Sequence, residues 1–131
     1  MRRLSLALAL SALVPGAFSA AAAQAHHPHR HPRGAKIIMH GTSIDPSCRF
    51  VAGLMGVAHR QCAQACAEKG VSLVLLANSE LYILTVPGKP AASANAKVKQ
   101  YVEQEVKVMG TVFPAGQSYL IEVDSVAATT P

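Results

Sequence analysis

Residues 106–126 read VKVMGTVFPAGQSYLIEVDSV, and this stretch decides the fold class. Apolar and polar side chains alternate through 106–113 and again through 119–126, which is the period of a strand with one buried face. The sequence PAGQ at 114–117 separates the two halves and has the composition of a turn. The stretch therefore predicts a β-hairpin with Val and Ile side chains on its buried face.

Further strands are expected upstream of this hairpin. Residues 35–44 (AKIIMHGTSI) form an apolar run that ends at the turn-like sequence DPS. Residues 71–76 and 81–86 are rich in Leu, Val and Ile and predict a second hairpin. Between these elements we expect a short strand or loop over 49–55, a loop over 87–95 and a short helix within 96–104.

Residues 57–69 (VAHRQCAQACAEK) form the strongest helix prediction in the chain. The segment is rich in Ala and contains neither Gly nor Pro, and Gly70 stands where a helix commonly ends. The sum of the elements is mainly β, with about five short strands and one helix inserted after the first strands. A single sheet of this size buries only one face, so we expect it to curl into a small barrel that the helix closes at one end.

The helix motif H-x-x-C-A-x-x-C at 59–66 is similar to one found in small secreted or periplasmic bacterial proteins of undefined function. The alternating stretch 106–126 resembles the closing strands of bacterial OB-fold-like domains. The resemblance spans residues 36–126 and implies a small OB-like five-stranded β-barrel with a metal-binding or redox role for the helix. It implies no catalytic activity. Residues 127–131 are expected to be a frayed C-terminal tail.

The N-terminus has the pattern of a cleavable export signal. Arg2 and Arg3 are followed by an apolar stretch and then by small residues, which predicts a signal peptide over 1–25. Cleavage is expected after Ala25 or Ala23. The apolar stretch is shorter than the roughly 20 residues that span a membrane. We therefore predict a periplasmic or secreted protein without a membrane anchor after cleavage.

The positive charge of the chain does not indicate a nucleic-acid partner. The net charge is +5, but Arg2 and Arg3 belong to the predicted signal peptide, and ten Lys and Arg against seven acidic residues leave +3. From residue 36 onward, eight basic residues face seven acidic ones. Because phosphate binding needs a clustered basic face, and none is visible, we expect no nucleic acid to bind.

The chain has three cysteines, Cys48, Cys62 and Cys66. In the predicted helix, His59 precedes Cys62 by three residues and Cys66 by seven, so the three side chains share one stripe. Cys48 lies in the preceding turn and can fold back over that stripe. Three thiolates and an imidazole suit tetrahedral zinc, and thiolates also suit Cu(I). The main metal site is therefore predicted at Cys48, His59, Cys62 and Cys66, with copper or zinc as its ion.

The same cysteines allow two other interpretations. In an oxidising compartment two of three cysteines normally pair, so Cys48 could form a disulfide with Cys62 or Cys66 and staple a binding module that holds no metal. A thiol-redox role is the third interpretation. Catalysis by a Cys/His pair has no orienting group or oxyanion donor that the sequence identifies, so we expect no enzymatic activity.

Residues 26–35 (HHPHRHPRGA) form a polar, proline-rich segment that we expect to be disordered. Imidazoles at this density can chelate transition metals near neutral pH, where they are largely neutral. A weak second metal site is therefore predicted at His26, His27, His29 and His31, with a solvated linker as the alternative. Together these features favour a periplasmic or secreted metal-handling protein whose partners are a metal ion and a periplasmic protein.

Overall fold

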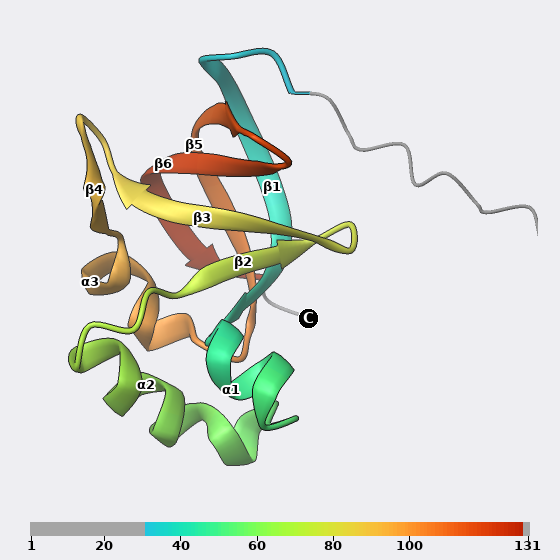
Figure 1. Cartoon of the computed structure of the whole chain (residues 1–131), viewed down its shortest axis with the longest axis vertical. Coiled ribbons are helices and arrows are strands. Elements are labelled where there is room, and N and C mark those ends of the chain that lie inside the picture. Colours follow the sequence, from blue (N-terminus) through green and yellow to red (C-terminus); the bar gives the residue numbers. More distant parts are fainter. Residues whose placement is uncertain (1–30, 130–131) are drawn as a thin grey trace, which may run out of the picture.

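The computed structural model describes residues 31–129, in which five strands close into a barrel above a layer of short helices (Figure 1). The predicted signal peptide, residues 1–25, lies outside the described residues. In chain order the elements are β1 (Ala35–Ile44), α1 (Pro46–Val51), η1 (Val57–His59), α2 (Arg60–Glu68), β2 (Val74–Ala77), β3 (Glu80–Val86), β4 (Lys89–Ser93), α3 (Asn95–Val98), η2 (Lys99–Tyr101), β5 (Glu105–Ala115) and β6 (Ser118–Ala128).

The barrel is OB-like and mainly β, as the sequence predicts. Strands follow one another around it in the order β2, β1, β5, β6, β3, and a further pairing of β2 with β3 closes the ring. All pairings are antiparallel except that of β3 with β6, which is parallel. Strand β4 pairs with β3 outside the ring.

The β5–β6 hairpin supplies one wall of the core through the alternation that its sequence shows. Val106, Val108 and Val112 of β5 are fully buried, as are Ile121 and Val123 of β6. The register places Val112 opposite Ile121 on the same face, where paired apolar side chains stabilise a sheet. The predicted hairpin is confirmed, although β6 runs to Ala128 and so includes two residues that were expected to fray.

Strand β1 pairs with both β5 and β2, and Gly41 allows its backbone to lie close to β2. Residues before Gly41 pair with β5, while the last residues of the strand pair with β2. A Cβ atom at Gly41 would lie 2.5 Å from the carbonyl oxygen of Leu76 and 2.9 Å from Cβ of Ala77. The backbones of β1 and β2 therefore approach so closely that only glycine fits without displacement of a strand.

We predict that Gly41→Ala lowers the free energy of unfolding by about 2 kcal/mol, because overpacked methyl groups force backbone shifts of that cost. Urea unfolding under reducing conditions measures the change. Ser118→Ala, at an exposed position of β6, is the control and should change stability by less than about 0.5 kcal/mol. An unchanged midpoint for Gly41→Ala would show that the strands are not in close contact.

The short helix expected within 96–104 is present as α3 and the 3₁₀ turn η2, and the helical layer also contains α1, which the sequence did not predict. The predicted helix over 57–69 is present as the short 3₁₀ turn η1 followed by α2. Residues 49–55 form neither a strand nor a simple loop, because α1 occupies 46–51. Asp45 caps that helix and Pro46 is its first residue, so the apparent turn signal was a helix start. No helix within residues 31–129 has the length and apolar character to cross a membrane.

Two other segments also differ from expectation. The predicted loop over 87–95 contains strand β4, which forms a hairpin with β3 around Pro87 and Gly88. The last part of the supposed disordered tail, 31–35, is held to the barrel because Gly34 N–H donates to the carbonyl of Val112 over 2.8 Å. Residues 26–30 of that tail lie outside the described part of the chain.

Candidate metal centre

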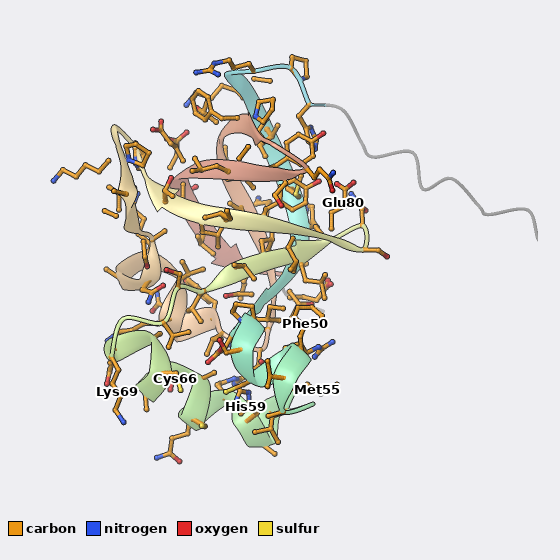
Figure 2. The ribbon with its side chains drawn as sticks, in the orientation of Figure 1. Phe50, Met55, His59, Cys66, Lys69 and Glu80 are labelled. Carbon is orange, nitrogen blue, oxygen red and sulfur yellow. The ribbon has the colours of Figure 1, made fainter. Side chains whose placement is uncertain are left out.

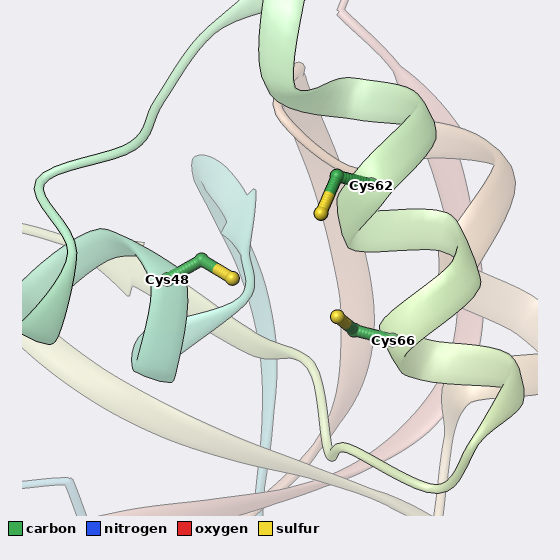
Figure 3. A group of neighbouring side chains, drawn as sticks. All are labelled: Cys48, Cys62 and Cys66. Atoms are coloured by element: carbon green, nitrogen blue, oxygen red, sulfur yellow. The ribbon is translucent and has the colours of Figure 1, made fainter.

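Three thiols meet between α1 and α2. Cys48 projects from α1, and Cys62 and Cys66 project from successive turns of α2 (Figure 3). Their sulfur atoms all lie within 4.8 Å of one another, and the three cysteines are free. Cys62 is exposed, whereas Cys48 and Cys66 are half-buried. This cluster could hold a metal ion.

Helix α2 presents its cysteines because its other face is anchored to the barrel. Ala63 and Ala67 are buried in the core cluster, each one residue beyond a cysteine. Small side chains at these positions let the helix backbone approach the barrel closely. Positions four apart share a helix face, so Cys62 and Cys66 lie on a second stripe beside the alanines.

Asn95, at the start of α3, fixes the C-terminal end of α2. Its amide nitrogen donates to the carbonyls of Ala67 and Val71 over 2.9 and 2.6 Å, and its side-chain oxygen accepts from Leu73 N–H over 3.0 Å. Three bonds from one side chain therefore join the helix to the segment that leads into β2. This joint sets the position of the turn that carries Cys66.

We predict that Asn95→Ala destabilises the fold by about 2 kcal/mol, because it leaves partly buried backbone groups without partners. Amide hydrogen exchange should speed up at Leu73 more than at Val112 in the barrel wall, because the lost bonds are local. Gln100→Ala, at an exposed side chain on the following turn, should leave both stability and exchange unchanged. Equal acceleration across the barrel would contradict the local role of Asn95.

Asp45 links the barrel to the thiols electrostatically. The residue is fully buried directly after β1, and its Oδ1 accepts from the N–H groups of Ser47 and Cys48 over 2.9 and 3.2 Å. Desolvation raises the pKa of Cys48 to about 12, with further contributions from a hydrogen bond to Asp45 and from its charge. Desolvation also raises the pKa of Cys66, followed by the charges of Cys62 and Asp45. Without a bound cation, Cys48 and Cys66 therefore stay protonated at neutral pH.

We predict that Asp45→Asn lowers the pKa of Cys48, because the substitution removes a negative charge that disfavours the thiolate. Asn remains a good N-cap, so α1 should persist. The ultraviolet absorbance of the thiolate, followed against pH in a background with serine at 62 and 66, measures the shift. Glu68→Gln is the control, because this exposed carboxylate pairs with Lys99 and is not among the causes of the Cys48 shift.

His59 is not part of the thiol cluster, which corrects the predicted Cys₃His site. The residue lies in the 3₁₀ turn η1 and is buried, with Nδ1 3.4 Å from Oε1 of Glu103. The other carboxylate oxygen of Glu103 accepts from Gly56 N–H over 2.8 Å. Figure 2 labels His59 and Cys66 at separate places in the helical layer, with His59 between Cys66 and Met55 in this view. The imidazole and Glu103 therefore hold the start of α2 against the barrel.

His31 also differs from its predicted role in a metal-binding tail. Its Nε2 lies 3.2 Å from the hydroxyl of Tyr82, and its ring contacts those of Tyr82 and Tyr119 edge-on, with centroids 5.9 and 5.0 Å away. Tyr82 OH donates to Glu80, which Figure 2 shows at the end of the barrel away from the cysteines. His31 thus packs on the barrel. His26, His27 and His29 lie outside the described residues.

Sequence reasoning missed three residues that build the site, namely Asp45, Asn95 and Glu103. The sequence Asp45-Pro46 was a recognisable helix start. Glu103 and Asn95 gave no comparable signal, because each acts on partners that are far away in the sequence.

No protein-family model, curated protein or solved structure matches this chain. Fold and site alone therefore define its class, an OB-like barrel protein with a three-cysteine cluster at one end.

Proposed function

We propose that this chain is an exported protein that binds a thiophilic transition metal, copper or zinc, for handling or delivery in the periplasm. The proposal rests on one observation. The sulfur atoms of three free cysteines, which come from two helices, all lie within 4.8 Å of one another. Thiolates are the ligands that Cu(I) and Zn(II) favour among protein side chains. The export pattern at residues 1–25 supports the compartment.

The surroundings of the cluster also suit delivery to another protein. Cys62 is exposed, so a metal held there would be accessible from solvent. Five large apolar side chains of the stretch between Cys48 and α2 are exposed, and a partner that receives the metal would contact them. They are Phe50, Val51, Leu54, Met55 and Val57.

A metal and thiol count on protein isolated from the periplasm tests this proposal. We expect about one copper or zinc ion per chain by elemental analysis, and three thiols that resist alkylation until a chelator removes the ion. Intact mass after alkylation counts the thiols. A variant with serine at 48, 62 and 66 should lose the ion, while Ser47→Ala, on the same helix, should keep it.

The same measurement identifies the competing functions. One stable disulfide with one free thiol and no metal would overturn the proposal in favour of a disulfide-stapled binding module. Three thiols that interconvert with a disulfide without any bound metal would overturn it in favour of a thiol-redox protein. Because the three sulfurs are close together, each of these states is within reach of the folded chain.

A further inference from the structure

The number of donor atoms that meet at the cluster separates the metals it can hold. Within residues 31–129 the group comprises three sulfurs, and no histidine, aspartate or glutamate joins it. Structural zinc sites almost always have four protein ligands in a tetrahedron. Cu(I) prefers soft sulfur ligands and is stable with three of them. Resting on the proposed function, we infer that Cys48, Cys62 and Cys66 bind Cu(I) as a three-coordinate ion in preference to Zn(II).

The histidine that would complete a zinc tetrahedron lies outside the sulfur group. Nδ1 of His59 faces Glu103, whose side chain is 1% exposed, while the buried Nε2 has no hydrogen-bond partner among the described residues and does not join the three sulfurs. A bond from Nε2 to the ion would need η1 to shift toward the sulfurs, which would draw the imidazole away from the buried Glu103 carboxylate. His59 is therefore a structural residue of this site and contributes no ligand.

The carboxylate of Asp45 also lies outside the sulfur group. Its Oδ1 caps α1 by accepting from two backbone N–H groups, while its buried Oδ2 has no hydrogen-bond partner in the part of the chain that the structure describes and does not join the three sulfurs. Removing the carboxylate from this position would uncap the six-residue helix that carries Cys48. Asp45 therefore adds negative charge near the thiols, which favours a bound cation, without serving as a fourth ligand.

The spacing of the sulfurs fits a single ion. Three sulfurs placed about 2.3 Å from a common centre in one plane are about 4 Å apart. The observed separations, all within 4.8 Å, need only a small inward movement of the side chains. The ion would be delivered as a Cu(I) complex with a small thiol. On loading, the Cu–S bonds to the carrier break as three S–Cu bonds to the protein form; the three S–H protons pass to the released carrier thiolates and to water, and copper stays Cu(I).

Competition between the two metals tests the inference. The variant H26A/H27A/H29A of the full chain removes the tail imidazoles while keeping His31 on the barrel. We expect the reduced, metal-free protein to take one Cu(I) from a chromophoric chelator, and one equivalent of Cu(I) to displace bound Zn(II). X-ray absorption at copper should show three sulfur neighbours and no imidazole.

Single substitutions complete the test. Cys48→Ser, Cys62→Ser and Cys66→Ser should each weaken Cu(I) binding by more than about 100-fold, because each removes a direct ligand. His59→Gln should change it by less than about threefold, with circular dichroism confirming the fold and the absorption spectrum still showing sulfur alone.

Two results would overturn the inference while leaving the proposed function intact. These are retention of Zn(II) against one equivalent of Cu(I), and an imidazole ligand at the bound copper. Failure of the reduced protein to bind either ion would instead refute the proposed function itself, so the two failures are distinguishable.

Discussion

The pairing of Ile44 with Val74 is the constraint on which the candidate site depends. These two residues are register partners of β1 and β2, and between them lies the whole insertion that carries the cysteines. The pairing of β1 with β2 therefore holds both ends of the insertion together. The pairing of the strands offsets the entropy cost of closing the loop between them. Helices α1 and α2 therefore need only small interfaces to stay in place.

From that constraint follows a division between scaffold and site. The core cluster is built mainly from barrel side chains. Helix α2 contributes Ala63 and Ala67, α3 contributes Val98, and the connecting segments contribute Leu73, Ala94 and Val102. The thiols lie outside this core, on helix faces that the barrel does not cover. The cysteines can therefore adjust to a ligand without repacking the buried valines.

The sequence predicted most of the barrel because its signals were local. Alternation at 106–126 and the Ala-rich run at 57–69 specify a hairpin and a helix without reference to the rest of the chain. Those signals failed where a distant partner decided the outcome. His59 was predicted on the stripe of Cys62, but it ends the 3₁₀ turn that precedes α2, and its Nδ1 lies against Glu103.

The three thiols could be found from the sequence, whereas the number of donor atoms that meet at the site could not. Spacing placed Cys62 and Cys66 together, and the short link to Cys48 placed it nearby. Only the fold shows that His59 lies against Glu103, outside the sulfur group. The number of donors that meet at the site therefore depends on a long-range contact between residues 59 and 103.

The shortness of α1 has a consequence for the lifetime of any bound ion. A six-residue helix has little stability of its own, and beyond it the chain passes through Gly53 and Gly56, both in the left-handed region. Two of the three thiols belong instead to α2, which is fastened to the barrel. An ion held by all three thiols would therefore lose Cys48 first, through local fraying of α1 that leaves the barrel folded.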